Sequence, residues 1–533
     1  MDLSLPSLAF RAWFIHDIRY SPNYTRPLFC GYTVPVYRNA PIASPLVLSF
    51  DRGTLLLKGA GPQEMISADP ARLWEWDARV TAYRCDAIHY AAVRSHLQLK
   101  FGPRFRDLLP PSSRVAFAKI NLPTLRPEQQ QAVAAWQTAG HRGMVVMPTG
   151  TGKTEVALAA MAAVRVSTLI VAPVRDLMHQ WHQRILRRLG YDAGIVGDSI
   201  LNIQPVTVTT YDSAYARMPE MGDRFGLIIF DEAHHLPGRS YREAALFSSA
   251  PMRLGLTATP DRADGRHVDL DSLIGPVVYR QEIAEAKGNT LADFEIVRIP
   301  VKLSEAEQGA YDAASRTVQS FLIECNRAAG AVSGGGAEEK SKTAGGRTGG
   351  TKRYTWQDLC ADAGENPAAR RAQKAFYFKK SIEDRATEKL RVLEDLFRLH
   401  AGERVLVFAA SNPMALDVSR RFLVPTLLAH SRKSERRIVL EGFAAGSFPV
   451  LVANQVLDEG VDVPEAKVAV VIGGQASTRQ AKQRLGRILR RSGNAKAVLY
   501  EIVCQDTNEE ERSRKRRRSD AYAKVKRKRG GTA

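Results

Sequence analysis

The sequence contains few cysteines and no long apolar run, and each absence excludes a class of protein. Its five cysteines are scattered and include no C-x-x-C pair, which argues against a disulfide framework and a zinc site and fits a reducing compartment. No stretch approaches the ~18 consecutive apolar residues of a membrane span, and the first residues, MDLSLPSLAFRAWF, lack the basic-then-apolar order of a signal peptide. We therefore expect a soluble intracellular protein without a membrane partner. It would be cytoplasmic and associated with the nucleoid in a prokaryote, or nuclear in a eukaryote.

Acidic residues are scarce relative to basic ones. Lys and Arg total 76 against 56 Asp and Glu, a formal net charge of +20 over 533 residues. Eleven basic residues and one acidic residue lie between Arg512 and Arg529, so this stretch supplies half of the excess. A polyanion is the natural partner, because each neutralised phosphate releases a condensed counterion. A solvated tail that binds acidic partners weakly is the alternative.

Apolar runs of strand length alternate with helical stretches over much of the chain, which is typical of a parallel sheet covered by helices. The alternation is interrupted between Pro300 and Val405, so we expect two α/β units. The strands expected in the first unit are Met144–Met147, Leu169–Val171, Val206–Thr209, Leu227–Phe230 and Arg253–Leu256, and those in the second are Val405–Phe408, Val450–Val452, Val468–Ile472 and Val498–Ile502.

The remaining segments differ in composition. From Pro45, PLVLSFDRGTLLLKG predicts a β-hairpin with its turn at Asp51-Arg52-Gly53, within a small α+β module. A helical pattern from Glu305 to Asn326 gives way to Gly-, Ser- and Lys-rich residues, which are typical of a flexible loop. The expected divisions are an unassigned segment 1–44, the N-terminal module 45–110, a first α/β lobe 111–300, a helical insertion 301–385 with a flexible loop 330–352, a second lobe 386–507 and a basic tail 508–533.

The strongest local signal is MPTGTGKT, Met147 to Thr154, between an expected strand and an expected helix at Glu155–Ala163. A Gly-rich turn there lets backbone N–H groups surround phosphate oxygens at a helix N-terminus. The lysine would place its charge on the β- and γ-phosphates of ATP, and the next hydroxyl would bind Mg²⁺. Met147 stands where the full pattern has glycine. The residues expected to bind ATP here are Pro148, Thr149, Gly150, Thr151, Gly152, Lys153 and Thr154.

Two carboxylates end the expected strand in LIIFDEAHH, Leu227 to His235. Asp231 would hold Mg²⁺ through its water shell, and Glu232 would polarise the attacking water. A solvated acidic pair at an exposed strand end is the alternative. The two histidines that follow lack the ligand spacing of a zinc site. Together with the phosphate loop, the carboxylates predict an ATPase that uses Mg²⁺.

D-E-A-H after a phosphate loop, then Thr257-Ala258-Thr259, then QRLGRILRR (Gln483 to Arg491) resembles the motif series of superfamily-two helicases and translocases. The resemblance implies an α/β fold of two RecA-like parallel-sheet lobes that clamp ATP between them. Arg487 and Arg490 would reach from the second lobe as arginine fingers, and Gln483 opens the same motif.

Four segments narrow the resemblance to the XPB-type DNA helicases of repair and transcription. It extends from Pro45 to Gln505 and implies that the N-terminal module senses distorted duplex and that the insertion is a thumb-like element that holds DNA. It also implies a nuclease or a transcription or repair protein as a further partner. The four segments are SFDRGTLLLKG (Ser49–Gly59), TVTTYDSAYARM (Thr207–Met218), LGLTATPDRADGRH (Leu254–His267) and ANQVLDEGVDVPEA (Ala453–Ala466).

Further motor residues carry over from this family by position. Arg126 and Gln129 match the adenine side of the ATP site. Pro173-Val174-Arg175 and Thr210-Tyr211 match first-lobe segments that follow a nucleic-acid strand. Arg262 and Asp264 match an Arg-Glu-Asp element implicated in opening DNA, with Ala263 in place of Glu. The second-lobe segment that couples strand contact to ATP is matched by Gln455, Glu459, Gly460 and Asp462.

These observations favour an ATP-dependent helicase that moves 3′ to 5′ and separates strands of forked, distorted or single-stranded DNA, in repair or transcription. The Ala263 departure leaves open a double-stranded DNA translocase or remodeller with little unwinding. An RNA helicase and a restriction-type motor subunit are weaker alternatives. A non-motor nucleic-acid tether switched by ATP is the alternative of a different class, and the presence of Lys153, Glu232, Arg487 and Arg490 argues against it.

Overall fold

The computed structural model describes most of the chain after Ser44. The chain divides into two units, Met1–Ser44 and Pro45–Ala533, and the described residues all lie in the second. Among the described helices, none is long and apolar enough to cross a membrane. The described residues are 45–69, 71–260, 265–282, 294–332, 354–428, 430–454, 466–473 and 497–517.

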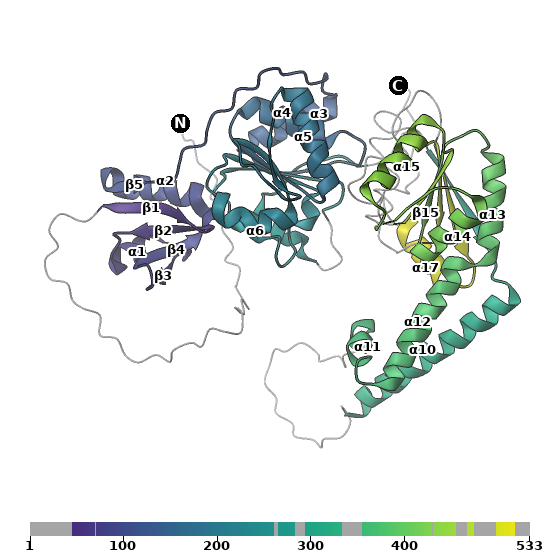
Figure 1. The fold of residues 1–533 in the computed structure, drawn as a ribbon. Helices are drawn as coiled ribbons and strands as arrows, with labels where there is room; N and C mark the ends of the chain where they lie inside the picture. Colours follow the sequence, from purple (N-terminus) through teal and green to yellow (C-terminus); the bar gives the residue numbers. More distant parts are fainter. Residues whose placement is uncertain are drawn as a thin grey trace, which may run out of the picture. The chain divides into compact units, whose positions relative to one another are not determined.

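A five-stranded sheet with two helices forms the N-terminal module (Figure 1), in the strand order β3-β4-β2-β1-β5. Asp51 pairs with Thr54 across the turn, which confirms the expected hairpin. Arg52 and Gly53 both have a positive φ, as a two-residue hairpin turn matched to the strand twist requires. The elements are β1 Leu46–Asp51, β2 Thr54–Lys58, α1 Pro62–Ala68, β3 Glu75–Asp77, β4 Ala82–Asp86, α2 Tyr90–Phe101 and β5 Phe105–Asp107.

The first lobe is built on an eight-stranded sheet in the order β13-β6-β12-β11-β7-β10-β8-β9. All pairs are parallel except β8–β9, and all five strands expected in this lobe are present. The strands are β6 Arg142–Val146, β7 Thr168–Ala172, β8 Gly194–Gly197, β9 Ile200–Leu201, β10 Val206–Thr210, β11 Leu227–Asp231, β12 Met252–Thr257 and β13 Val277–Arg280. The helices are α3 Pro127–Thr138, α4 Lys153–Val164, α5 Arg175–Leu189, α6 Tyr211–Met221, α7 Glu243–Leu246 and α8 Asp269–Leu273.

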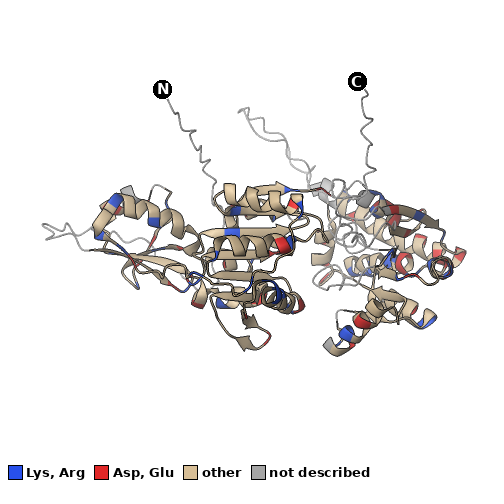
Figure 2. Cartoon of the chain, turned by 90° about the horizontal axis from the view of Figure 1, so that it is seen from above, with Lys and Arg blue, Asp and Glu red and all other residues tan. Residues whose placement is uncertain are grey.

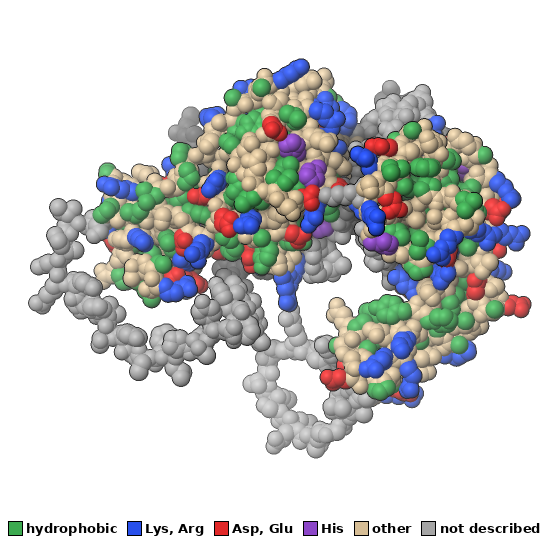
Figure 3. Space-filling view, in the orientation of Figure 1, with side chains coloured by type: hydrophobic (Ala, Val, Ile, Leu, Met, Phe, Trp, Pro, Cys, Tyr) green, Lys and Arg blue, Asp and Glu red, His purple; other side chains and the backbone are tan. Residues whose placement is uncertain are grey.

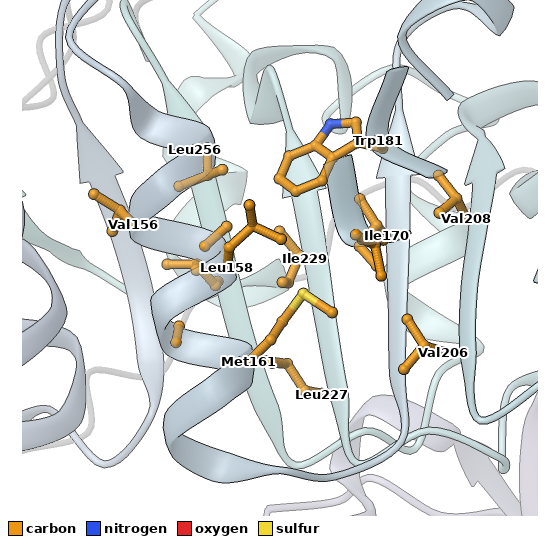
Figure 4. Packing of buried hydrophobic residues seen from close by; sticks show 14 of the residues in the cluster. Val156, Leu158, Met161, Ile170, Trp181, Val206, Val208, Leu227, Ile229 and Leu256 are labelled. Atoms are coloured by element: carbon orange, nitrogen blue, oxygen red, sulfur yellow. The ribbon is translucent and has the colours of Figure 1, made fainter. Parts of the chain in front are cut away.

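Apolar side chains of α4 and α5 pack on one face of this sheet (Figure 4). Leu158 and Met161 of α4 lie over Ile229 of β11, and Trp181 of α5 lies beside Ile170 of β7. In Figure 2 the central strands are almost entirely tan, while charged residues mark helices and loops. Continuous apolar strands are expected where both faces of a parallel sheet are covered. The carboxyl ends of these buried strands carry the polar loops described below.

The second lobe has a six-stranded, all-parallel sheet in the order β14-β19-β18-β15-β17-β16. Strand β14 pairs with β19 along its whole length, so it belongs to this sheet although the expected boundary at residue 300 put it in the first lobe. A strand's sheet is decided by its partner, which the local pattern does not reveal. The elements are β14 Phe294–Val301, α13 Thr387–Leu399, β15 Val405–Ala409, α14 Asn412–Phe422, β16 Thr426–Leu427, α15 Lys433–Ala445, β17 Val450–Ala453, β18 Val468–Ile472, β19 Ala497–Cys504 and α17 Asn508–Arg517.

The described part of the insertion consists of helices α10 Glu305–Val332, α11 Trp356–Asp362 and α12 Pro367–Arg385. A small core that includes Phe321 and Leu359 holds them together. Figure 3 shows hydrophobic and basic side chains next to one another on this arm. Helix α10 continues past Asn326 and includes the first residues of the segment 330–352 that was expected to be a loop. The rest of that segment, to residue 352, lies outside the described residues.

The basic tail begins as an ordered part of the second lobe. Helix α17 contacts β19, and its Glu509 carboxylate binds the Lys389 ammonium with Nζ–Oε distances of 2.8 and 2.7 Å. Both side chains are fully buried. Arg512, the first basic residue of the tail, forms an ion pair with the buried Glu383 at the end of α12. The expected division at residue 508 therefore separates groups that are bonded to one another.

Candidate active site

The sequence that is expected to bind phosphate forms the loop between β6 and α4. Gly150 and Gly152 have φ values of 84° and 76°, a left-handed region that glycine adopts without strain. The Thr151 hydroxyl donates to the carbonyl oxygen of Pro148 at 2.7 Å and closes the turn. Lys153 begins α4, is buried, and donates from Nζ to the carbonyl oxygen of Met147 at 3.2 Å. The ammonium group is thereby held against the loop at the helix N-terminus.

Helix α3 supports this loop from the side. Gln129 Nε2 donates to the carbonyl oxygen of Thr151 at 3.0 Å, and the Arg126 guanidinium donates to the same oxygen. A Cβ atom at Gly152 would lie 2.5 Å from Gln129 Nε2, so any other residue there would displace this amide as well as strain the backbone at φ 76°. The two residues expected on the adenine side therefore contact the loop itself.

Met147, the departure from the expected glycine, is a core residue. Its side chain is fully buried in the first-lobe cluster, and its backbone N–H donates to the carbonyl oxygen of Thr257 at 3.0 Å. A side chain directed into the core leaves the inner surface of the loop to the residues that follow. The departure is thus compatible with a phosphate loop.

Asp231 and Glu232 lie at the carboxyl end of β11. Trp181 Nε1 of α5 donates to Asp231 Oδ2 at 2.8 Å, and the Glu232 backbone N–H donates to Asp231 Oδ1 at 3.0 Å. Burial and the neighbouring Glu232 charge raise the pKa of Asp231 to about 6, against the lowering effects of Trp181 and Lys153. This carboxyl group therefore holds its proton more tightly than an ordinary aspartate.

A polar chain leads from the carboxylates to the loop after β12. Nδ1 of His234, which is fully buried, lies 3.1 Å from Thr257 Oγ1 and 3.5 Å from Glu232 Oε2. The Thr257 hydroxyl also accepts a hydrogen bond from the backbone N–H of Thr259. Within the described part of the chain, no group of three His, Cys, Asp or Glu side chains could hold a metal ion. His234 links two motifs of the first lobe.

Several buried oxygens at this edge of the sheet are well placed for a polar ligand. Thr149 Oγ1 and Thr259 Oγ1 are buried and have no hydrogen-bond partner among the described residues, and Glu232 Oε2 is buried at its 3.5 Å contact with His234 Nδ1. Thr154 Oγ1 accepts a hydrogen bond from Arg184 Nη1 at 2.8 Å and keeps a second lone pair for a cation. Hydroxyl and carboxylate oxygens are the ligands that Mg²⁺ prefers. The donor set therefore fits a magnesium–phosphate group.

Two residues of the expected nucleic-acid contacts, Thr210 and Tyr211, have buried side chains. The Tyr211 side chain is 1% exposed and donates from its hydroxyl to the backbone carbonyl oxygen of Asp231 at 3.0 Å. Thr210 is 5% exposed, and its hydroxyl caps helix α6 by accepting from the Ser213 backbone N–H. Their side chains support the strand that carries the carboxylates. The position of a residue in a motif does not show whether its side chain faces the nucleic acid or the protein core.

Arg175 is an exposed residue of the other expected contact segment, as is Val174. Its guanidinium lies 3.2 Å from the Asp198 carboxylate and its side chain is 65% exposed, while Pro173 is half-buried. Nothing tests the remaining expected site residues, because Arg262, Ala263, Asp264, Gln455, Glu459, Gly460, Asp462, Gln483, Arg487 and Arg490 lie outside the described residues.

Trp181 and Arg184 are site residues that the sequence did not predict. The spacing of Met178, Trp181, Ile185 and Leu189 marks one face of α5 as apolar, and all four are buried. That pattern identifies Trp181 as a core residue. The partner of its indole N–H depends on the packing of α5 beside β11, which no local pattern contains.

Three family models match the chain. Residues 48–102 match the Xeroderma pigmentosum group B helicase damage recognition domain. Residues 122–262 match the Type III restriction enzyme, res subunit. Residues 374–520 match the ERCC3/RAD25/XPB C-terminal helicase. The first and third matches place both ends of the described chain in the same family.

Relatives that match most of the chain include two that are more than 30% identical to it. The DNA 3′-5′ translocase XPB2 of Sulfurisphaera tokodaii is 36% identical over 449 residues, which is 83% of this chain and 95% of the relative. The DNA 3′-5′ helicase XPB of Kineococcus radiotolerans is 31% identical over 409 residues, which is 74% of this chain and 62% of that relative's length. The match to the crystal structure of the Hef helicase domain of Pyrococcus furiosus covers 73% of this chain and 98% of that domain, at 19% identity and a TM-score of 0.45. The chain belongs to the XPB family of superfamily-two helicases.

Proposed function

We propose that this chain is an ATP-driven motor that moves 3′ to 5′ along DNA and separates its strands, in DNA repair or transcription. The observation that carries the proposal is the meeting of a phosphate loop and two carboxylates at one edge of the first sheet. Lys153 begins the helix after β6, and Asp231 and Glu232 end β11, two strands away in the sheet. The names of the two relatives supply the polarity and the DNA substrate.

Each group of the site has a role in this proposal. The backbone N–H groups of the loop and the Lys153 ammonium neutralise charge on the β- and γ-phosphates, and Glu232 takes the proton of the attacking water. Thr154 and Asp231 would hold Mg²⁺, which supplies positive charge to the phosphate oxygens when bound. Two adjacent carboxylates, one with a raised pKa, are an arrangement that a divalent cation stabilises.

The second lobe would complete the site. Arg487 and Arg490 are assigned as arginine fingers, with Gln483 at the start of the same motif, and Gly460 and Asp462 as residues that couple strand contact to ATP. The match of residues 374–520 to the family's C-terminal helicase supports these assignments. Closure of the two lobes on ATP would order the arginines, and reopening after hydrolysis would advance the grip on DNA.

DNA is the proposed partner, in forked, distorted or single-stranded form. The net charge of +20 supports it, as does the match of the N-terminal module to a damage recognition domain. Arg175, Arg262 and Asp264 are proposed to contact the strand in the first lobe, and the insertion would act as the thumb. A nuclease or a transcription or repair protein is the proposed protein partner.

Double-strand translocation with little unwinding is a second candidate that two observations favour. Ala263 stands where the family's strand-opening element has glutamate. The relative at 36% identity is named a translocase rather than a helicase. In this variant of the proposal, ATP hydrolysis and polarity are unchanged and strand separation is weak.

Two displacement assays on the full chain separate the candidates. A labelled strand annealed beside a 3′ or a 5′ single-stranded overhang reports unwinding and its polarity. A third strand bound in the major groove of a blunt duplex reports translocation without unwinding. Release only from the 3′-overhang substrate supports the helicase, and release of the third strand alone supports the translocase. Release by Lys153→Ala at the wild-type rate would refute an ATP-driven motor.

A further inference from the structure

A concave site that the motor mechanism does not use lies in the N-terminal module. It is a pocket of about 550 Å³ between α1 and the β3–β4 edge of the small sheet, which lie side by side in Figure 1. Its lining includes Met65, Ile66, Asp69, Arg72, Trp74 and Tyr83. Ligand pockets in proteins have volumes of roughly 300–1,000 Å³ and combine apolar walls with a few polar groups.

Aromatic rings form the wall on the side of the sheet. Trp74 precedes β3 and Tyr83 lies on β4, and both are half-buried. Trp76 pairs with Tyr83 across the two strands, and their rings meet edge to face with centroids 5.0 Å apart, which orients the Tyr83 ring. Met65 of α1 is buried, while Ile66 is 80% exposed. The pocket therefore offers flat apolar surface that is open to solvent at one side.

The polar lining selects against an anion. Both oxygens of Asp69 accept backbone hydrogen bonds, from the Leu73 N–H at 2.7 Å and the Trp74 N–H at 3.0 Å. The carboxylate thus fixes the short segment that carries Arg72 and Trp74, and its negative charge repels a phosphate. The exposed Arg72 has φ 52°, a strained conformation for a side chain other than glycine. One positive and one negative group fit a neutral ligand with polar edges.

We infer that this pocket receives one unpaired nucleobase displaced from the DNA stack. A base has two π-faces for the aromatic rings, polar edges for Arg72 and Asp69, and no charge of its own. The DNA backbone stays outside, at the rim, where Asp69 does not repel it. The inference rests on the proposed function, since it names the feature of distorted DNA that the module reads. The pocket belongs to a different sheet from Lys153 and Asp231.

The test measures a base-specific preference with three duplexes and the full chain. One duplex carries a bulged 2-aminopurine, the second a bulged abasic residue at the same position, and the third a fully paired 2-aminopurine. Fluorescence anisotropy gives the dissociation constants, and 2-aminopurine quenching reports stacking on a ring. The abasic bulge interrupts the duplex at the same position but has no base. The ratio of the two dissociation constants therefore isolates the contribution of the base to binding. Stacking of a base on an aromatic side chain typically contributes roughly a 5- to 150-fold gain in affinity.

Four variants identify the residues responsible. Trp74→Leu removes the ring face but keeps apolar bulk, and Trp74→Phe restores a ring. Arg72→Gly removes the side chain at a backbone position where glycine is unstrained, so loss of folding is not expected. Lys58→Ala removes a positive charge from the same module at an exposed position outside the pocket lining.

We expect at least about a 5-fold preference for the bulged base and quenching of its fluorescence in the wild type. The preference should vanish in Trp74→Leu, weaken in Arg72→Gly, and persist in Trp74→Phe and Lys58→Ala. Equal affinity of the wild type for the two bulges, or an unchanged preference in both Trp74→Leu and Arg72→Gly, overturns the inference. DNA-stimulated ATP hydrolysis is measured on the same samples. Its absence in the wild type would refute the motor instead, whereas normal hydrolysis without base preference would refute only the pocket.

Discussion

The indole Nε1 of Trp181 donates a hydrogen bond to Oδ2 of Asp231 over 2.8 Å, and this bond joins helix α5 to the end of strand β11. The same helix begins at Arg175, the exposed residue that we propose contacts DNA. Helix α5 therefore carries both a proposed DNA contact and the hydrogen-bond donor to the carboxylate that would hold Mg²⁺. If DNA binding moved α5, the hydrogen bond from Trp181 would change the position or the charge environment of Asp231.

Trp181→Phe should move the acid limb of ATP hydrolysis to higher pH. Asp231 must be ionised to hold Mg²⁺, and burial together with Glu232 raises its pKa to about 6, so activity is lost as the pH falls through about 6. The indole N–H stabilises the ionised form, and its removal raises this pKa further, by about one unit for a hydrogen bond to a charged group. The measurement is the pH profile of hydrolysis at subsaturating Mg²⁺.

Trp136→Phe is the matched control for that shift. Trp136 is also fully buried in the first lobe, and its Nε1–H donates to the backbone carbonyl oxygen of Arg253 at 2.9 Å. The two variants should lose similar stability, but only Trp181→Phe should shift the acid limb. Identical profiles for both variants would mean that the bond to Asp231 does not control its ionisation.

Lys153→Ala and Glu232→Gln should each reduce ATP turnover at least about 100-fold, the loss that follows removal of one preorganised catalytic group. In the proposed mechanism Lys153 supplies positive charge at the phosphate loop, and Glu232 supplies the proton acceptor. DNA affinity without nucleotide should stay near the wild-type value, because neither group belongs to the proposed strand contacts. Wild-type hydrolysis in either variant would contradict the site assignment.

Gln129→Ala should weaken nucleotide binding about 5-fold through the loop rather than through direct contact. The hydrogen bond from its side-chain amide to the Thr151 carbonyl oxygen is buried, and a neutral hydrogen bond contributes about 1 kcal/mol to stability. Isothermal titration with a non-hydrolysable ATP analogue measures the effect. Gln130→Ala is the control, since the Gln130 amide donates to the Leu125 carbonyl at an exposed position. Equal losses in the two variants would argue against a specific role for Gln129.

Two truncations should separate the structural and DNA-binding parts of the tail. A chain that ends at Arg517 keeps the bonds of Glu509 and Arg512, so it should unfold at the wild-type temperature. It loses six basic residues (Arg518, Lys524, Lys526, Arg527, Lys528 and Arg529), so its DNA affinity should fall and depend less steeply on salt. An unchanged salt slope would mean that residues 518–533 do not contact DNA.

A chain that ends at Thr507 leaves Lys389 buried without Glu509. Loss of one partner from a buried ion pair costs about 3–5 kcal/mol, so this chain should show a clearly lower unfolding temperature. Calorimetry of both truncations makes the comparison. Equal stability of the two would contradict the structural role of α17.

Local patterns predicted the elements of this fold better than their partners. Every expected strand is present, because apolar runs such as Leu227–Phe230 identify buried strands without knowledge of the rest of the chain. The assignment of β14 to the first lobe was wrong, because its partner β19 lies about two hundred residues away in the sequence. Pairing over that separation depends on the whole sheet.

In the candidate site too, local patterns predicted the segments but not all of their contacts. The loop from Pro148 to Thr154 and the carboxylates after β11 were predicted from their spacing alone, and the structure brings both to one edge of the sheet. The bonds of Trp181 and Arg184 were not predicted, because they depend on how α5 packs beside β11. Tyr211 was expected to contact DNA because its motif position does not reveal that its side chain is buried.

The most direct test of the motor is steady-state ATP hydrolysis by the full chain, alone and with single-stranded DNA, forked DNA, blunt duplex or RNA. We predict strong stimulation by forked or single-stranded DNA and little by RNA, with no activity in Lys153→Ala. Stimulation by blunt duplex alone would favour the translocase variant of the proposal. Hydrolysis that is absent under every condition, or equal with and without DNA, would contradict a DNA-dependent motor.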